Sequence, residues 1–162
     1  SAFPGFFLTG NIPEATGRGI ELTADYRGDS GWGMNASVGW LRTKITDAGT
    51  IATAFQGAEL PNAPKFTGSL GLSYEHAAGW DARASVRYVD EMTNTLGGPL
   101  LDDYIIVDLA AGYDFTGARN SDWRLDLFVN NLTNTAYIIE NASGRDIVGR
   151  PREIGISVTM RF

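Results

Sequence analysis

The stretch EIGISVTMRF, residues 153–162, decides how this chain is expected to fold. Every second residue in the stretch is apolar, and polar residues or glycine stand between the apolar ones. A two-residue period of this kind is typical of a β-strand with one apolar face and one polar face. The row closes on an aromatic ring, which predicts that the chain ends inside a strand. The apolar row consists of Ile154, Ile156, Val158, Met160 and Phe162.

The same period recurs along the chain in long segments that are separated by turn-forming residues. Twenty glycines and six prolines divide the sequence, and both residues favour turns over the interiors of strands. No stretch approaches the roughly 18 consecutive apolar residues of a membrane-spanning helix. The sequence therefore predicts an all-β antiparallel meander of about eight strands with almost no helix. The clear segments are 20–27, 32–40, 65–75, 80–88, 105–115, 123–130 and 153–162, with an incomplete strand in residues 3–10.

Composition excludes several classes of function. The net charge is -6 and the isoelectric point is near 4.7, and the basic residues look scattered along the sequence. Nucleic-acid binding depends on clustered Lys and Arg, so no nucleic-acid partner is expected. The chain has no cysteine and one histidine, His76. Disulfides, thiolate chemistry and a histidine metal cluster are therefore excluded, and we expect no cofactor and no metal.

The aromatic residues fall at two levels along the predicted strands. One level flanks the short turns, and the second lies about eight residues further along each strand, which corresponds to about 20 Å for tilted strands. Outer-membrane barrels have an apolar band about 25 Å tall between two aromatic girdles. The pattern therefore predicts a transmembrane β-barrel wall in contact with outer-membrane lipid. The predicted girdle residues are Tyr26, Trp32, Tyr74, Trp80, Tyr113 and Trp123 at the first level and Trp40, Phe66 and Tyr88 at the second.

Connection length alternates between short and long. The short connections lie near residues 28–31, 76–79 and 116–121, and the long ones near 45–63, 92–102 and 133–149. Because successive strands run in opposite directions, each kind of connection gathers at one end of the sheet. Bacterial barrels place short turns in the periplasm and long loops outside. Localisation in the outer membrane with the C-terminus in the periplasm is the expected arrangement.

The second face of the strands mixes small polar residues with charges of both signs, which favours a wet lumen with cross-strand ion pairs. A soluble β-sandwich would show the same alternation and stays an open alternative, although its strands are usually only about five or six residues long. We also expect Arg150 and Arg152 to form ion pairs between loops. The charged residues of the polar face are Glu75, Arg83, Arg87, Asp108, Arg124 and Asp126.

No group of residues predicts an enzyme. Ser73, Glu75 and His76 contain the residue types of a catalytic triad, but His76 lies on the opposite face of the strand from the other two. A histidine within a turn is the better interpretation. The acidic residues 102–103 and Asp108 are of the type that binds calcium, yet adjacent acids at the start of a strand are usually solvated. No catalytic residue is assigned.

Three motifs give the chain a resemblance to a known family. Residues 123–137 read WRLDLFVNNLTNTAY, residues 149–153 read GRPRE, and residues 60–67 read LPNAPKFT. GRGIEL at 17–22 is a further match. In this combination and order they resemble the C-terminal part of TonB-dependent outer-membrane receptors, and the resemblance extends over nearly the whole chain.

The resemblance implies a receptor with a plug domain inside a barrel of about 22 strands. Such receptors bind a scarce nutrient, for example a siderophore, cobalamin or an oligosaccharide, and import it with energy relayed by TonB. Residues 1–162 would form part of the barrel, roughly its C-terminal third, without the plug. The final strand would present its apolar row to the barrel-assembly machinery, and TonB would act through the plug.

A self-contained eight-stranded barrel with a structural or adhesive role is the alternative, because eight strands suit 162 residues. The two hypotheses differ in whether a longer reading frame precedes residue 1, and we expect that it does. For the receptor, substrate contacts are expected from the long connections. The candidates, which bear aromatic rings or amides, are Phe55, Gln56, Tyr104, Tyr137 and Asn141.

Overall fold

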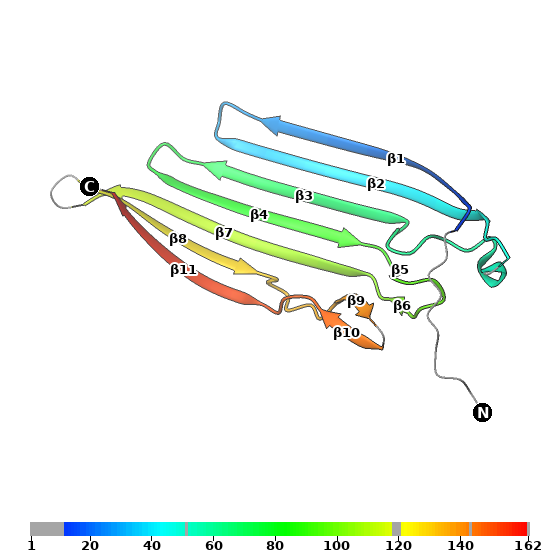
Figure 1. Ribbon diagram of the computed structural model, residues 1–162. Coiled ribbons are helices and arrows are strands. Elements are labelled where there is room, and N and C mark those ends of the chain that lie inside the picture. The colour runs from blue at the N-terminus through cyan, green and yellow to red at the C-terminus, as the bar shows by residue number, and fades with distance from the viewer. Residues whose placement is uncertain (1–11, 51, 118–120, 143, 162) are drawn as a thin grey trace.

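One antiparallel sheet of seven strands dominates the computed structural model, which describes residues 12–50, 52–117, 121–142 and 144–161 (Figure 1). The strands follow one another in space in their chain order, as a meander. They confirm the predicted all-β class, while the strand predicted in residues 3–10 lies outside the described residues. The strands are β1 (Glu14–Arg27), β2 (Trp32–Asp47), β3 (Phe66–Glu75), β4 (Trp80–Val89), β7 (Tyr104–Thr116), β8 (Asp122–Asn130) and β11 (Glu153–Arg161).

The first two strands are longer than the alternation predicted. β1 begins at Glu14, six residues before the expected start, and β2 continues to Asp47. The added residues pair with each other in continuous register from Ala15 opposite Ile45 onward. Backbone hydrogen bonds extend a ladder whatever the side chains are, so the strands continue past the point where the apolar row stops.

The register between the strands brings the apolar rows onto one face. Trp40 lies opposite Phe66, and Leu70 lies opposite Val86. The same matching holds for every neighbouring pair of strands as far as Leu127 opposite Ile156. Side chains alternate strictly between the faces of a strand, so one whole face is apolar and the other is polar.

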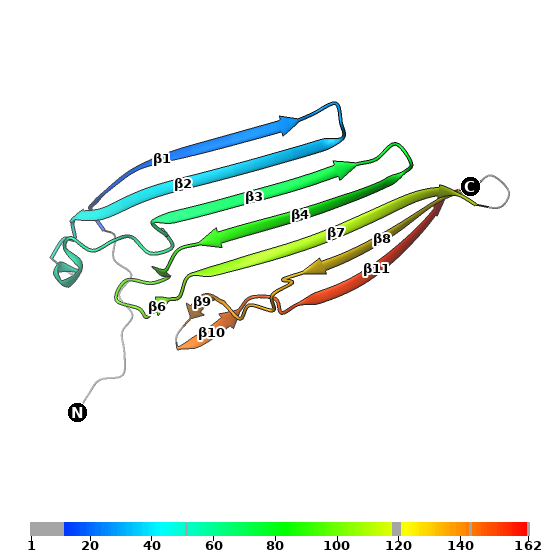
Figure 2. The same cartoon turned by 180° about the vertical axis from the view of Figure 1, so that it is seen from behind.

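Nothing in the described part of the chain covers the apolar face. Leu22 is 66% exposed, Ile156 is 67% exposed and Ile154 is 76% exposed. Figures 1 and 2 show a single curved layer from its two sides. A sandwich would bury such a row against a second sheet, so the sandwich alternative is wrong. The buried hydrophobic side chains among the described residues are instead close to the long connections: Ile45, Ala48, Leu101 and Ile106.

The sheet is open. β1 and β11 stand at the two ends of the strand order and are not paired with each other. A self-contained barrel would require its first and last strands to meet. The described strands therefore form a wall, as expected for part of a larger barrel, and each edge presents unpaired backbone groups.

Short and long connections separate to opposite ends of the sheet, as predicted (Figure 1). Among the short turns, those at 28–31 and 76–79 each dock on the neighbouring strand through a glycine. The backbone of Gly31 pairs with Glu75, and that of Gly79 pairs with Asp114. Both glycines have positive φ, and a Cβ on either would collide with the partner carbonyl, so glycine is required at both positions.

The long connections contain only short elements. These are the 3-10 helix η1 (Thr53–Phe55) and the small hairpins β5 (Met92–Thr93) with β6 (Leu100–Leu101) and β9 (Ile138–Ala142) with β10 (Arg145–Val148). No helix of the described residues has the length and apolar character needed to cross a bilayer.

A single buried amide closes the connection between β8 and β11. The Nδ2 of Asn131 donates to the carbonyl oxygens of Thr135 (2.9 Å) and Arg150 (3.0 Å), and its Oδ1 accepts from the Thr135 N–H (2.9 Å). The backbone N–H of Asn131 donates to Asp108 Oδ1 on β7 (2.8 Å). Asn131 is 3% exposed and has a φ of 51°, a conformation that Asn tolerates better than most residues.

Asn134, in the same turn, also uses its side-chain amide to hold the backbone of the segment before β11. Asn134 Oδ1 accepts from the backbone N–H of Arg152 at 3.0 Å. The expected ion pairs of Arg150 and Arg152 between loops are not formed among the described residues. Arg150 lies 3.9 Å from Glu153 within its own segment. The two arginines contact the turn through their backbones, and their side chains are not used for it.

We predict that Asn131→Ala destabilises the fold by about 2–4 kcal/mol, since it removes three side-chain hydrogen bonds, leaves buried groups unpaired and places alanine at positive φ. Asn131→Gly removes the same bonds without the backbone strain and should cost less. Urea unfolding followed by tryptophan fluorescence measures both, with Thr133→Ala in the same turn as the control. Equal stability of Asn131→Ala and Thr133→Ala would contradict this role.

Candidate functional site at the long connections

The connection between β2 and β3 is fixed to the end of β2. Gln56 reaches back to this strand: its Oε1 accepts from the Ala48 N–H (2.9 Å), and its Nε2 donates to the Thr46 carbonyl (2.6 Å). Both polar atoms of the predicted contact residue Gln56 thus have partners inside the loop. Its neighbour Phe55 is better placed for contact with another molecule.

Phe55 lines a cavity of about 310 Å³ between this connection and the β5–β6 hairpin. The aromatic ring approaches Gly97, where a Cβ would lie 2.9 Å from it. An ion pair between Lys65 and Glu59 (3.2 Å) forms part of the wall. Apolar side chains form most of the remaining lining, namely Leu60, Met92, Leu96 and Leu100.

The predicted residues Tyr104 and Tyr137 meet at a different place. Their ring centroids are 4.5 Å apart at an interplanar angle of 30°. Tyr104 begins β7 on the polar face, since Ile105 is on the apolar face opposite Tyr88. Tyr137 lies over Gly149, where any Cβ would collide with the ring. This contact joins the segment that ends at Tyr137 to the GRPRE segment, which begins at Gly149.

Three asparagines connect all three long connections. Asn62 donates its backbone N–H to Thr93 (2.8 Å) and its Nδ2 to the Asn94 carbonyl (3.4 Å). Asn94 Nδ2 in turn donates to the backbone carbonyl of the predicted contact residue Asn141 (3.0 Å). Asn141 Nδ2 donates to Asp146 at 2.5 Å. The three connections therefore form one hydrogen-bonded unit.

Asn94 joins these connections, and the sequence interpretation did not single it out. Its side chain is 7% exposed, and its Oδ1 has no hydrogen-bond partner among the described residues. The predicted contact residues do not form one cluster: Phe55 lies in the cavity, the two tyrosines pair elsewhere, and Gln56 and Asn141 hold the loops. The described residues contain no group of three or more His, Asp or Glu that could hold a metal.

His76 is a turn residue, as predicted. Its Nδ1 accepts from the Ala78 N–H at 3.1 Å, and its ring stacks on Trp80 with centroids 5.0 Å apart. Among the hydrogen bonds of the described residues, the His76 side chain has Ala78 as its partner, and none joins it to Ser73 as a catalytic triad would need.

The predicted aromatic levels are two rows on the apolar face. At the short-turn end, the ring centroid of Tyr74 lies 4.7 Å from that of Trp32 and 5.0 Å from that of Trp80. Tyr26 extends this row on β1, and Tyr113 and Trp123 extend it across β7 and β8, opposite Trp80 and Phe115. At the other level, Phe66 lies opposite Trp40 and 6.0 Å from Tyr88.

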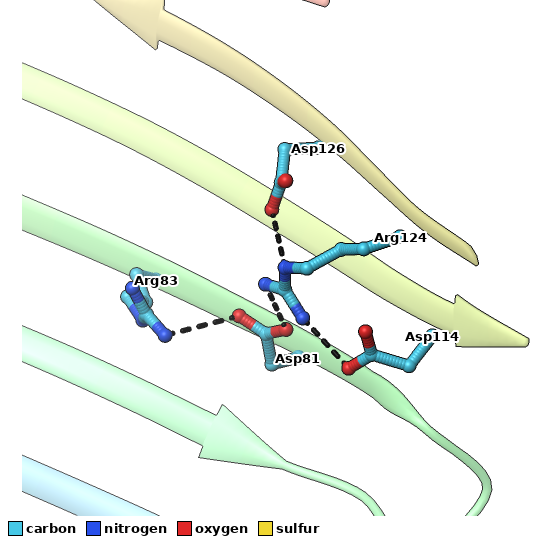
Figure 3. A network of polar contacts seen from close by, with 5 residues as sticks. All are labelled: Asp81, Arg83, Asp114, Arg124 and Asp126. Carbon is cyan, nitrogen blue, oxygen red and sulfur yellow. Dashed lines mark hydrogen bonds and ion pairs between the residues drawn. The ribbon is translucent and has the colours of Figure 1, made fainter. Parts of the chain in front are cut away.

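The polar face has a compact ion-pair network near the short turns (Figure 3). Arg124 on β8 pairs at 2.8 Å with each of Asp81, Asp114 and Asp126, and Asp81 also lies 3.4 Å from Arg83. The network joins β4, β7 and β8. It confirms the expected cross-strand pairs for Arg124, which reaches Asp81 on β4 and Asp114 on β7. Arg83 and Asp126 form ion pairs with residues of their own strands, β4 and β8.

The other predicted charges of this face behave differently. Asp108 accepts the backbone N–H of Asn131, while Arg87 and Glu75 form no ion pair among the described residues.

Gly112 makes the network possible. It lies on β7 between Asp81 on β4 and Asp126 on β8. A Cβ at this position would collide with the guanidinium of Arg124 and would lie 2.6 Å from Asp81 Oδ2. Arg124 thus crosses β7 through a gap that only glycine leaves open.

We predict that Gly112→Ala destabilises the protein by about 1–3 kcal/mol, as overpacking does, but that it has little effect once Arg124→Ala has removed the crossing side chain. Thermal or urea unfolding of the two single variants and the double variant gives the coupling energy. Gly17→Ala on the same face, where a Cβ would meet only an ordinary contact at 3.8 Å, is the control. Additive effects of the two substitutions would contradict this account.

Comparison with known proteins places the chain in a family. Residues 1–132 match the family described as TonB dependent receptor-like, beta-barrel. The chain is 30% identical over 166 residues to the metal-pseudopaline receptor CntO of Pseudomonas aeruginosa. The aligned region covers 98% of the chain and 22% of that receptor. It is 31% identical over 113 residues to the ferrioxamine B receptor of Salmonella typhimurium, which covers 66% of the chain and 16% of that receptor.

Among solved structures, the ferric preacinetobactin receptor BauA from Acinetobacter baumannii superimposes with a TM-score of 0.77 at 19% identity. The match covers 90% of the chain and 22% of BauA, so it supports the fold. The chain spans about a fifth of the length of each of these proteins. TonB-dependent receptors are outer-membrane proteins of receptor and transport function. Because the family match covers most of its residues, this chain belongs to the TonB-dependent receptors and forms part of their β-barrel.

Proposed function

We propose that this chain is a section of the lipid-facing wall of an outer-membrane receptor that imports a metal chelate with energy relayed by TonB. One observation supports this most strongly: a continuous apolar face stays exposed and is bordered by two aromatic rows. A soluble protein rarely exposes a large contiguous apolar patch. Hydrocarbon in place of water against this face removes the cost of exposing it.

The spacing of the aromatic rows fits a bilayer. Trp32 and Trp40 mark the two levels on β2, eight residues apart by number, which is about 20 Å along the membrane normal for a tilted strand. Trp and Tyr prefer the membrane interface because their rings are apolar and their N–H and O–H groups reach water. In this arrangement the short turns and the C-terminus lie in the periplasm, and the long connections lie outside.

A metal chelate is the substrate class we favour over cobalamin or an oligosaccharide. The relatives are named as receptors for metal-pseudopaline and ferrioxamine B, and BauA as a receptor for ferric preacinetobactin. In this chain, Tyr104 and Tyr137 form a paired aromatic surface at the outer end of the polar face. Aromatic rings of this kind can pack against a ligand, with their hydroxyl groups available for hydrogen bonds.

Three further partners follow from this function. The barrel-assembly machinery would recognise the apolar row of β11, whose final ring, Phe162, lies outside the described residues. TonB would act through a plug domain that a barrel of about 22 strands encloses. Adjacent strands of that barrel would pair with the free edges of β1 and β11, because unpaired backbone N–H and C=O groups are costly in contact with lipid. The wall itself is not an enzyme in this proposal.

We predict that Val86→Lys, in the middle of the apolar face, lowers the free energy of unfolding by about 2–4 kcal/mol in lipid vesicles, because a charge at the bilayer midplane is costly. Ser85→Lys is the matched control, since its side chain points to the polar face and should cost much less. Urea titration of the intact receptor in vesicles measures both. Equal losses for the two variants would argue against lipid contact.

We predict that removing both rings, Tyr104→Ala with Tyr137→Ala, weakens binding of the ferric chelate by about tenfold or more, as expected when about 1.4 kcal/mol of contact is lost. Tyr137→Phe keeps the ring and should bind nearly as the wild type does. Binding to the intact receptor and growth under iron limitation are the measurements. Tyr113→Ala, at the short-turn end of the sheet, is the control. Unchanged affinity of the double variant would show that neither tyrosine ring contacts the chelate.

A further inference from the structure

Strand pairing gathers three basic side chains at one place on the outward face of the first hairpin. Arg18 on β1 lies directly opposite Arg42 on β2, and Lys44 follows on the same strand opposite Thr16. Arg18 shares a face with Ile20, and Arg42 and Lys44 share it with Trp40, because side chains two residues apart point the same way. The interpretation of the basic residues as scattered is therefore wrong for these three.

The neighbouring residues fix the direction in which these side chains point. Thr43 and Ile45 alternate with Arg42 and Lys44 and are buried, and Thr43 Oγ1 accepts from the Leu60 N–H at 2.9 Å. Arg42 and Lys44, in contrast, are exposed, as is Arg18. The basic side chains thus lie on the face of the wall opposite Thr43 and Ile45, which is the apolar, lipid-facing side.

The three charges have no counter-ion in the part of the chain that the structure describes. No ion pair among the described residues involves Arg18, Arg42 or Lys44. The acids that follow in the register, Glu14 and Asp47, lie opposite each other two pairs beyond Thr16 and Lys44. Like charges directly opposite on neighbouring strands repel and destabilise the pairing. An anion between them would offset this repulsion, and the arginine guanidinium groups suit phosphate oxygens in particular.

The position of the group along β2 selects the source of that anion. Arg42 and Lys44 follow Trp40, the outer aromatic level, by two and four residues, which places them about 5–10 Å further out in tilted strands. This is the depth of lipid headgroups at the outer surface. Ile20 (63% exposed) and Trp40 (44% exposed) adjoin the charges on the inner side, where acyl chains would contact them.

We infer that Arg18, Arg42 and Lys44 form a binding site for the phosphate groups of a phosphorylated glycolipid in the outer leaflet, with its acyl chains on Ile20 and Trp40. The site rests on the proposed outer-membrane location but is separate from the chelate-binding loops. A free phosphate ion would gain from the charges alone, whereas the lipid gains from both the charges and the apolar row. A membrane lipid therefore fits the site better than a free phosphate ion does.

The test measures lipid binding to the purified intact receptor in detergent by native mass spectrometry, with diphosphorylated lipid A as the probe. The variant with Arg18→Gln, Arg42→Gln and Lys44→Gln should bind it about 100-fold more weakly, since each basic group near an anionic lipid surface contributes about a factor of five. The wild type should lose a similar factor with lipid A that lacks both phosphates. Millimolar inorganic phosphate should not compete.

Matched variants separate a specific site from a loss of net charge or of fold. Arg27→Gln, Arg87→Gln and Arg145→Gln together remove the same charge elsewhere and should leave lipid affinity unchanged. Arg18→Lys with Arg42→Lys keeps the charges and should bind within about tenfold of the wild type, because only the bidentate geometry is lost. Equal weakening by both triple-glutamine variants would overturn the site.

Other outcomes also decide the question. Equal affinity for the two forms of lipid A, or displacement by inorganic phosphate, would overturn the inference. Fractionation of the membranes separates this failure from that of the proposed function. A wild-type receptor absent from the outer membrane would refute the function. A receptor present there that binds lipid equally with and without the three charges would refute only the lipid site.

Discussion

The phase of strand pairing is the constraint on which the rest of this structure depends. A shift of one residue between two strands would move a whole apolar row to the other face of the sheet. All neighbouring strands pair in the phase that keeps the rows together, from Trp40 opposite Phe66 to Leu127 opposite Ile156. The turns help to fix this phase, because Gly31 and Gly79 each allow a backbone pairing with the next strand that any side chain would block.

The same phase explains which parts of the fold could be predicted from the sequence. Strands are visible where one face is apolar and the other is polar, as in β11, because hydrophobicity then alternates along the sequence. The ends of β1 and β2 near the long connections were missed because basic residues such as Arg18 and Lys44 interrupt the apolar row there. The hydrogen-bonded ladder continues regardless of the side chains, so the strands extend beyond the signal that reveals them.

The candidate site was predictable only at the level of residue type. Aromatic residues in the long connections were proposed as contacts, and Tyr104 and Tyr137 do meet. Asn94 and Gly112 could not be identified, since their roles depend on partners far along the chain, such as Asn141 and Arg124. No local pattern records such contacts. Asn131 was visible as part of a motif, but its partners appear only in three dimensions.

The hydrogen bonds between β8 and β11 suggest how one wall can carry a connection of variable sequence. Asn131 bonds to the backbone oxygens at positions 135 and 150, and Asn134 bonds to the backbone N–H of Arg152. Contacts with the backbone place no demand on the side chains at those positions. The loop between them can therefore change in sequence while its ends stay fixed to β8 and β11. At the opposite end, the Arg124 network is built from side chains and needs Gly112 as well, so substitutions there are expected to be tolerated less. Sequence variation is therefore expected to concentrate at the end of the wall that carries the long connections.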